Sequence, residues 1–266
     1  MDADTRHTEI LKLLEQKDRV EVEELADRFD VSLQTIRADL RELSARNALS
    51  RVHGGAVRIS SAANRAYADR RKLNARGKLE MATLAADLIP DNCSITLNIG
   101  TSTEKVARAL SGHRGLTVLS NNINIINMMM GSTAMGGQTK NLILVGGTVR
   151  QSDGAIVGED AVEFISRYKV DYAVIGASAL DADGAVMDHD ASEVSVARAI
   201  LKNARTKVLV CDGSKFEHTA PVRICSVEDL DVVITDRPVP REFAQTAQRG
   251  ETRIITAAQT ESSEND

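Results

Sequence analysis

Residues 31–40 read Val31-Ser32-Leu33-Gln34-Thr35-Ile36-Arg37-Ala38-Asp39-Leu40, and this stretch decides the fold of the N-terminal part of the chain. Ile36, Leu40 and the later Leu43 recur at the spacing of a buried helical stripe. Ser32 precedes the stripe, and a serine hydroxyl there can accept a hydrogen bond from a free backbone N–H of the first turn. The pattern predicts a helix over 33–46 that begins after a Ser32 cap.

Two more helices are predicted upstream by the same spacing. Apolar residues at helical intervals indicate one helix over 5–16 and another over 22–30. A short break at Asp30-Val31 separates the second helix from the third. Two helices joined by so short a turn form a helix-turn-helix unit.

The third helix also has a polar face that is suited to nucleic acid. Arginine and glutamine carry paired donors for base edges, and hydroxyl side chains can reach phosphates. Because the N-terminal residues of such a helix enter the major groove, double-stranded DNA is the expected partner. The expected contact residues on this helix are Ser32, Gln34, Thr35, Arg37 and Arg41.

Residues 49–58 predict a β-hairpin, which would form a wing beside the helices. Gly54-Gly55 lies between two β-prone runs, as in a two-residue hairpin turn. Arg51, His53 and Arg58 line this hairpin and could hold phosphates or enter the minor groove. An ordinary exposed hairpin is the alternative.

The net charge of −5 hides a basic block. Residues 28–80 carry 12 Lys or Arg against 5 Asp or Glu, whereas the segments before and after this block are acidic. A basic block within an acidic chain indicates a local polyanion site, and a solvated charged face is the alternative.

The stretch 31–40, followed by Arg51-Val52-His53-Gly54-Gly55-Ala56, resembles the signature of the DeoR family of bacterial sugar-metabolism regulators. That family usually shows T-I-R-R-D-L, whereas this chain has Ala38 in place of the second arginine. The resemblance implies a DNA-binding regulator that lacks one family contact at position 38. Ala38 should not destabilise the helix, because alanine has the highest helix propensity of all residues.

From residue 78 onward, short apolar strands alternate with helices. Such alternation predicts an α/β domain with a mostly parallel sheet covered on both faces. The predicted strands are 93–99, 116–119, 142–145, 172–175, 207–211 and 232–235. The predicted helices are 78–89, 103–111, 122–130, 159–168, 191–204 and about 239–248.

Polar residues follow five of these strands, where sheets of this class bind ligands. Hydroxyls and free N–H groups at a helix N-terminus favour an anion, although plain helix capping explains them too. A lysine would neutralise a phosphate, and aromatics are only 3% of the chain, so stacking on a base is disfavoured. A small phosphorylated polyol or sugar is therefore the expected effector. Its expected contacts are Gly100, Thr101, Ser102, Thr103, Asn121, Asn122, Gly146, Gly147, Asp153, Gly176, Ser178, Asp181, Asp212 and Lys215.

These strand ends also resemble the DeoR effector domain, which is similar in fold to ribose-5-phosphate isomerase. The resemblance covers about residues 5–240. Within the family, stretches such as 98–104, 121–124 and 214–216 look most like the subgroup that responds to glycerol 3-phosphate. The resemblance implies a repressor of a carbohydrate or polyol catabolism operon, with glycerol 3-phosphate or another sugar phosphate as inducer.

The 266 residues are expected to hold two domains. A winged helix-turn-helix over 1–58 and a linker over 59–77 precede an effector-binding domain over 78–256, and a disordered tail occupies 257–266. Because tandem half-sites need two reading heads, a dimer or tetramer is expected.

Other features favour a cytoplasmic chain without metal or cofactor. Cys93, Cys211 and Cys225 lack C-x-x-C spacing and read as buried thiols of a reducing compartment. No run of 18 apolar residues predicts a membrane span, and the polar N-terminus does not read as a signal peptide. Asp188-His189-Asp190 reads as a polar loop near the ligand rather than a metal site.

Two other functions remain open at this stage. A sugar-phosphate isomerase with an added DNA-binding domain could use Glu193, Asp181 and Lys215 in proton transfer. The chain lacks the Asp-Gly-Ala-Asp motif that the isomerase resemblance leads one to expect, so a regulator that is not an enzyme is favoured. The sequence does not separate repression from activation.

Overall fold

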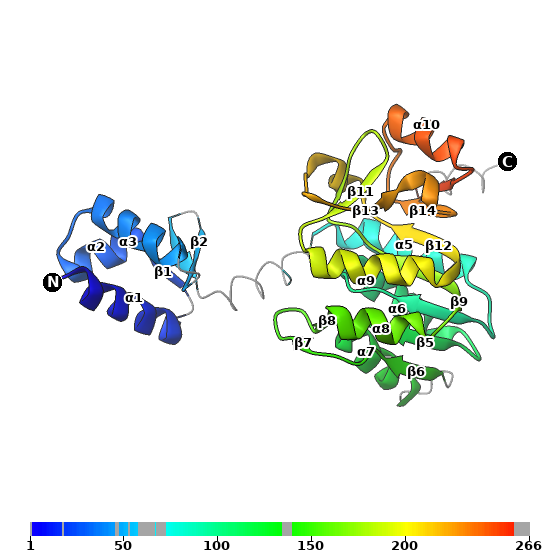
Figure 1. The fold of residues 1–266 in the computed structure, drawn as a ribbon, viewed down its shortest axis with the longest axis horizontal. Coiled ribbons are helices and arrows are strands. Elements are labelled where there is room, and N and C mark those ends of the chain that lie inside the picture. Colours follow the sequence, from blue (N-terminus) through cyan, green and yellow to red (C-terminus); the bar gives the residue numbers. More distant parts are fainter. Residues whose placement is uncertain are drawn as a thin grey trace. The chain divides into compact units, whose positions relative to one another are not determined.

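The computed structural model divides the chain into two compact units, Met1–Arg70 and Arg71–Asp266 (Figure 1). Each unit has its own hydrophobic core. The structure describes residues 2–17, 19–45, 48–52, 54–57, 67, 73–134 and 140–257.

Unit 1 is a winged helix-turn-helix, as the sequence predicts. Three helices pack over a small antiparallel sheet with strand order β1-β3-β2. The core between them is mainly aliphatic and includes Ile10, Leu25, Ile36 and Leu40, each no more than 1% exposed. The elements are α1 (Ala3–Lys17), β1 (Arg19–Glu21), α2 (Val22–Phe29), α3 (Leu33–Ala45), β2 (Ser50–Val52) and β3 (Gly55–Val57).

The wing contains one strand more than the predicted hairpin. β1 pairs with β3, with Val20 opposite Ala56, and thereby fixes the wing to the helices. Gly54 has φ of 79°, the left-handed conformation that a tight turn requires of glycine. A three-residue strand carries too little pattern to be recognised in the sequence.

Unit 2 is built on a seven-stranded sheet in which every neighbouring pair is parallel. This architecture confirms the predicted α/β class. In order across the sheet, the strands are β15 (Arg253–Thr256), β14 (Val232–Thr235), β12 (Ala204–Val210), β9 (Val170–Ile175), β4 (Ser94–Leu97), β5 (Thr117–Ser120) and β6 (Asn141–Leu144).

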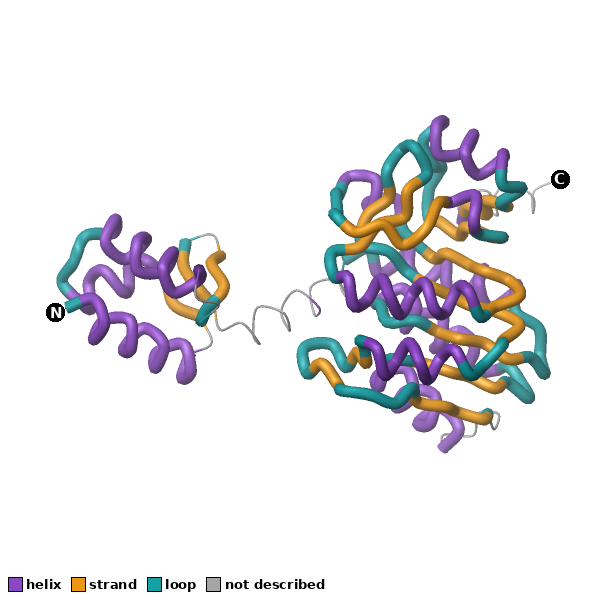
Figure 2. The backbone as a smooth tube through the Cα atoms, in the orientation of Figure 1, coloured by secondary structure: helices purple, strands orange, loops and turns teal. Residues whose placement is uncertain are grey.

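Helices cover both faces of this sheet, which gives three layers (Figure 2). The buried stripes of three helices join one core cluster, and those of the other three join a second. The first face carries α5 (Ala75–Leu88), α6 (Thr101–Ala109) and α7 (Ile123–Ala134). The second carries α8 (Glu159–Ser166), α9 (Ala191–Lys202) and α10 (Arg241–Arg249).

The direction of chain growth across the sheet reverses between β4 and β9. From β4 the chain adds β5 and then β6 on one side, whereas β9, β12, β14 and β15 lie on the other. The N–H of Asn98 donates to the carbonyl of Val174 at 3.0 Å and holds the two strand ends together. Open α/β sheets bind ligands at such a switch point, beyond the carboxyl ends of the strands.

Several short elements of unit 2 depart from the prediction. A small antiparallel sheet contains β10 (Ala179–Leu180), β11 (Ala185–Asp188) and β13 (Val222–Ser226), and β7 (Val149–Arg150) pairs with β8 (Ala155–Ile156). α5 begins at Ala75, so the last residues assigned to the linker are helical. The rest of that linker, apart from Tyr67, Leu73 and Asn74, and all but the first residue of the predicted tail lie outside the described residues.

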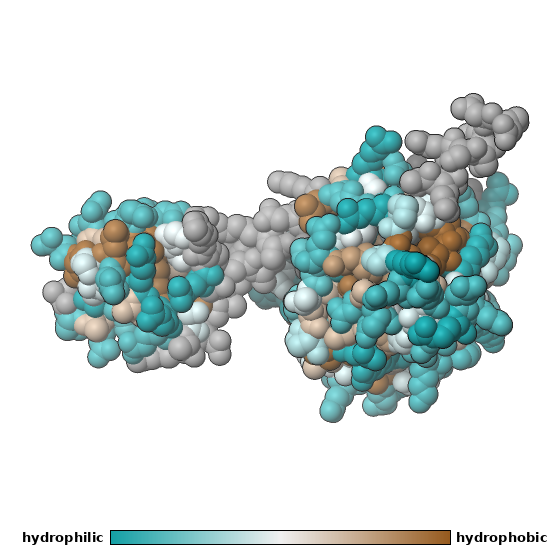
Figure 3. Space-filling model, turned by 90° about the horizontal axis from the view of Figure 1, so that it is seen from above, coloured by the Kyte–Doolittle hydropathy of each residue, from teal (hydrophilic) through white to brown (hydrophobic). Residues whose placement is uncertain are grey.

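In the view of Figure 3, the surface of each unit is mainly hydrophilic with small apolar areas. No helix among the described residues is long and apolar enough to span a membrane.

Candidate functional site

Ser32 caps α3, as predicted. Its Oγ accepts a hydrogen bond from the backbone N–H of Thr35 at 3.1 Å and lies 2.8 Å from Thr35 Oγ1. The two hydroxyl side chains therefore hold the first turn of the helix, and they lie at its exposed end.

The outward face of α3 gathers the other predicted contact residues. Gln34, Arg37 and Arg41 are exposed, and their spacing of three and four places them along one face of the helix. Ala38 lies on this face as well and is exposed. Leu33 was not selected from the sequence, yet it is 41% exposed beside Gln34. The sequence feature that could have identified Leu33 is its position as an apolar residue outside the buried stripe of Ile36, Leu40 and Leu43.

A hollow of about 370 Å³ lies between α3 and the wing. Arg37 from α3 and Arg51 from β2 both line it, together with Glu23 from α2. Gly55 lies at the wing side, where a Cβ would meet the carbonyl oxygen of Val20 at 2.0 Å. His53 and Arg58 lie outside the described residues.

Asp39 points inward from the same helix and has a structural role that the sequence did not indicate. Its carboxylate accepts from Arg6 Nε at 2.6 Å and from a second Arg6 nitrogen at 3.0 Å, and it lies 3.1 Å from His7 Nε2. Burial raises the pKa of Asp39, but the hydrogen bonds and charges of Arg6 and His7 outweigh this and hold the pKa below its usual value. The ion pair joins α1 to α3.

The switch point of unit 2 brings the β4–α6 loop to the carboxyl edge of the sheet. Gly100 has φ of 137° and precedes α6, whose first turn contains Thr101, Ser102 and Thr103. Thr103 Oγ1 donates to the carbonyl of Gly100 at 2.8 Å, which closes the turn. The helix N-terminus lies at the edge where an anion is stabilised by its dipole.

Two buried amide oxygens at this edge lack partners within the described part of the chain. They are Asn98 Oδ1, after β4, and Asn121 Oδ1, after β5. Asn98 is 5% exposed and Asn121 is not exposed at all, and the Asn121 amide nitrogen donates to the carbonyl of Ile156 at 3.1 Å. A buried acceptor without a donor costs free energy, so these oxygens mark a place for a hydroxyl or N–H group.

Asn122 is engaged inside the protein. Its amide nitrogen donates to Glu104 Oε1 at 3.2 Å, and its Oδ1 accepts from the N–H of Asn124 at 2.8 Å. It therefore links the start of α7 to α6. Glu104 was not selected from the sequence, although a carboxylate four residues after Gly100 falls in the first turn of the helix.

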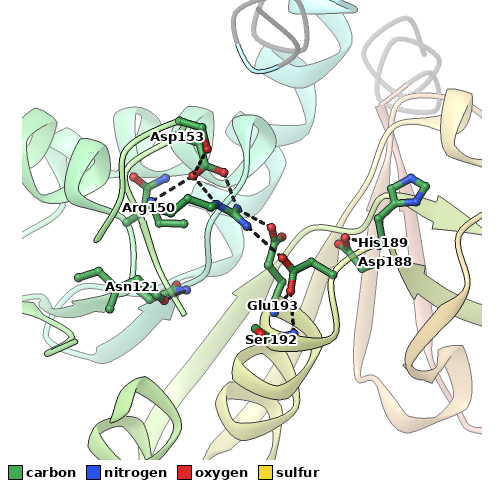
Figure 4. A network of polar contacts seen from close by, with 12 residues as sticks. Asn121, Arg150, Asp153, Asp188, His189, Ser192 and Glu193 are labelled. Atoms are coloured by element: carbon green, nitrogen blue, oxygen red, sulfur yellow. Dashed lines mark hydrogen bonds and ion pairs between the residues drawn. The ribbon is translucent and has the colours of Figure 1, made fainter. Parts of the chain in front are cut away.

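Arg150 is the centre of a polar network that joins the β7–β8 hairpin to the start of α9 (Figure 4). It donates to Asp153 at 2.7 and 3.0 Å, to Asp190 at 3.3 Å and to Glu193. The Asp153 hydrogen bonds raise the pKa of Arg150 most strongly. Burial raises the pKa of Glu193, and the charge of Arg150 opposes that shift. Asp188 lies nearby and accepts from Ser178 Oγ at 3.0 Å.

The end of β12 contributes Asp212 and Lys215. Asp212 is buried and accepts from the N–H of Ser214 at 3.2 Å, which starts the 3-10 helix η2 (Gly213–Glu217). Lys215 is half-buried, and no hydrogen bond or ion pair to its ammonium is found within the described ranges. Burial raises the pKa of the Cys211 thiol to about 12, while the nearby charge of Lys215 lowers it.

The remaining predicted residues divide into two groups. Gly146, Gly147 and Gly176 follow strands β6 and β9 at the carboxyl edge. Asp181 lies elsewhere, in the β10–β11 turn, where the N–H of Gly184 donates to its carbonyl at 3.0 Å. That turn contacts Val227 and Thr246, which precede β14 and β15 at their amino ends. The structure thus does not bring Asp181 to the switch point, because β10 runs back from the carboxyl edge.

Comparison with known proteins assigns both units to one family. Residues 6–62 match the DeoR-like helix-turn-helix domain, and residues 73–237 match the DeoR C terminal sensor domain. The chain belongs to the DeoR family. This DeoR-family repressor is 40% identical to the glycerol-3-phosphate regulon repressor of Escherichia coli over 240 aligned residues. The alignment covers 90% of this chain and 93% of that protein. It is 38% identical to the Haemophilus influenzae protein of the same name, over 96% of this chain and 97% of that one.

Among solved structures, this DeoR-family chain is similar to ribose 5-phosphate isomerase A from Methanocaldococcus jannaschii, with 17% identity and a TM-score of 0.37. That match covers 52% of each chain. It is too distant to carry an argument about the site. The relatives that cover nearly the whole chain are named as repressors and not as enzymes.

Proposed function

We propose that this DeoR-family repressor binds operator DNA of a carbohydrate or polyol catabolism operon and is released by a small phosphorylated effector, with glycerol 3-phosphate as the first candidate. Unit 1 would read the DNA, and the switch point of unit 2 would bind the effector. The named relatives support the choice of glycerol 3-phosphate, because that compound occurs in the names of two proteins that match almost end to end.

The reading surface would combine α3 and the wing. Gln34, Arg37 and Arg41 would face base edges in the major groove, and Arg51 would hold phosphate beside them. Leu33 adds an apolar surface suited to a thymine methyl group. Two copies of the chain would bind two half-sites of the operator, so the protein would act as a homo-oligomer. It would bind its operator in the cytoplasm.

The observation that carries the effector proposal is the pair of buried, unpartnered oxygens of Asn98 and Asn121 at the switch point. Both are acceptors, so the groups that would satisfy them are donors such as the hydroxyls of a polyol. The first turn of α6 and the ammonium of Lys215 would hold the phosphate at the same edge.

The Arg150 network is a poor place for the phosphate itself. Three carboxylates, those of Asp153, Asp190 and Glu193, surround one guanidinium, so the cluster repels an added anion. Asp153 is already engaged and would border the effector rather than bind its hydroxyls. The phosphate would therefore lie toward Gly100, Thr101 and Lys215.

A thermal-shift screen of phosphorylated three- to six-carbon compounds tests this proposal. A compound that binds the folded chain adds about 2.7 kcal/mol of stability at a hundredfold excess over its Kd. We expect glycerol 3-phosphate to raise the melting temperature of the full chain and glycerol to leave it unchanged. Lys215→Ala should lose this shift, because the ammonium would otherwise pair with the phosphate.

Three results would change the proposal. If no phosphorylated compound shifts the melting temperature of the unmodified chain, the sensor function is ruled out. If glycerol 3-phosphate raises the melting temperature of Lys215→Ala as much as that of the unmodified chain, Lys215 does not bind the phosphate. A hit with a hexose phosphate alone would replace glycerol 3-phosphate as the effector.

A further inference from the structure

The start of α5 is tied to the end of β14 through Asp236. Asn74 directly precedes α5, and its amide nitrogen donates to Asp236 Oδ2 at 2.6 Å. Asp236 directly follows β14, at the carboxyl edge of the sheet. Unit 2 begins at Arg71, so Asn74 is one of its first residues. In the sequence it closely follows the end of unit 1 at Arg70.

The other oxygen of the same carboxylate holds η2. Asp236 Oδ1 accepts the backbone N–H of Gly213 at 2.7 Å, and Gly213 is the first residue of η2. Lys215, the proposed phosphate ligand, lies two residues further along. One carboxylate thus connects the proposed effector site with the first helix of unit 2.

Two glycines make this bridge close-packed. A Cβ on Gly77 would lie 2.8 Å from Asp236 Oδ2 and 2.7 Å from Asn74 Oδ1. A Cβ on Gly213 would lie 2.1 Å from Arg237 Nε, and Arg237 in turn donates to Glu217 at the end of η2, at 2.7 Å. Gly77 therefore packs against the Asn74–Asp236 contact, and Gly213 packs against Arg237, so a shift of η2 would press on the residues that follow β14.

The geometry points to Asp236 as a positioning residue that couples effector occupancy beside Lys215 to the start of α5, and through α5 to operator affinity. This inference rests on the proposed function. An effector can change operator affinity only if some element differs between the two states, and the Asn74–Asp236–Gly213 bridge would be that element. Coupling between two sites in proteins is typically about 5- to 150-fold in affinity.

A variant of Asn74 tests the bridge without touching the effector ligands. Asn74 has φ of 50°, which aspartate tolerates as asparagine does. Asn74→Asp keeps the size of the side chain but places an acceptor against the Asp236 carboxylate, so the hydrogen bond is replaced by repulsion. The double variant Asn74→Asp, Asp236→Asn exchanges the two groups and restores a donor–acceptor pair, while the new amide oxygen can still accept from Gly213.

Asp231→Asn is the matched control. Asp231 directly precedes β14 as Asp236 directly follows it, and its Oδ2 accepts the backbone N–H of Lys207 on β12 at 2.7 Å. The contact is of the same kind, but it lies at the amino ends of the strands. Asp231→Asn removes the charge but leaves an amide oxygen that can still accept from Lys207, and it should not affect coupling.

The experiment measures two quantities on the full chain. One is the ratio of operator affinities without and with saturating glycerol 3-phosphate, and the other is the Kd for glycerol 3-phosphate alone. We expect Asn74→Asp to keep the effector Kd and the effector-free operator affinity within about twofold, and to lower the ratio at least about fivefold toward one. The double variant should recover most of the ratio, and Asp231→Asn should keep all of it.

An unchanged ratio in Asn74→Asp, with a melting temperature like that of the unmodified chain, would overturn the bridge while the proposed function stands. Failure of the double variant to recover coupling would also count against it. If the unmodified chain shows no effect of glycerol 3-phosphate on operator affinity, the proposed function fails and the inference falls with it.

Discussion

Asp39 belongs to the signature stretch of α3, yet it faces away from the surface that would meet DNA. The neighbouring Arg37 is exposed, whereas Asp39 is 5% exposed and is held by Arg6 and His7 of α1. The stretch therefore combines two functions in one turn of helix. Its Arg37 would contact DNA, and its Asp39 fixes the helix that carries this arginine. The sequence could not reveal the second role, because Arg6 and His7 lie more than 30 positions away.

Asp39→Asn should destabilise unit 1 by about 2 kcal/mol, since the buried Arg6 would lose its charged partner. The folded-state pKa of Asp39 is lowered, so its stabilising contribution is present above the unfolded-state value of about 3.9 and is lost as pH falls through the folded-state pKa. Hydrogen exchange of α1 and α3 in the full chain measures this at pH 6 and pH 3. The variant should exchange faster at pH 6 and approach the unmodified chain at pH 3, and equal rates at pH 6 would contradict the role of the ion pair.

At the scale of elements, long periodic segments were predictable and short paired ones were not. α2, α3 and six strands of the parallel sheet fall within a few residues of their expected bounds, because each carries a repeated apolar pattern. The seventh strand, β15, was not predicted. β1, β7, β8 and β10 have two or three residues each and exist only through pairing with distant segments. The candidate site divides in the same way. Its strand ends were predictable, whereas Arg150 meets Glu193 across 43 positions that only the fold brings together.

The wing gives a prediction for an element as a whole. Gly55→Ala would place a Cβ 2.0 Å from the Val20 carbonyl oxygen, a backbone atom that cannot rotate away, so β1 and β3 must separate. We expect unit 1 to lose about 1–3 kcal/mol, as for other overpacked sites, and the operator affinity to fall with it. Gly112→Ala is the control, since nothing lies within 4 Å of the added Cβ. A Gly55→Ala chain with unchanged hydrogen exchange in unit 1 and unchanged operator affinity would show that the wing tolerates the extra atom.

At the scale of the whole molecule, one chain carries a DeoR-like helix-turn-helix domain in one unit and a DeoR C terminal sensor domain in the other. If the proposed effector weakens DNA binding, thermodynamic linkage requires that DNA weaken effector binding by the same factor. Because the chain as a whole carries a net charge of −5, it should not attract DNA non-specifically. Operator binding would then depend on the local basic residues of unit 1 and should weaken as the salt concentration rises.

The most direct test of the account is a titration of the full chain with a duplex selected by this protein from a random pool, with and without saturating glycerol 3-phosphate. Fluorescence anisotropy gives both affinities, and Arg37→Ala, which lacks one of the exposed guanidinium groups of α3, is the control for specific binding. The account predicts that glycerol 3-phosphate lowers the affinity of the unmodified chain by about 5- to 150-fold and that Arg37→Ala binds only weakly under both conditions. An affinity that does not change at effector concentrations that raise the melting temperature would contradict it.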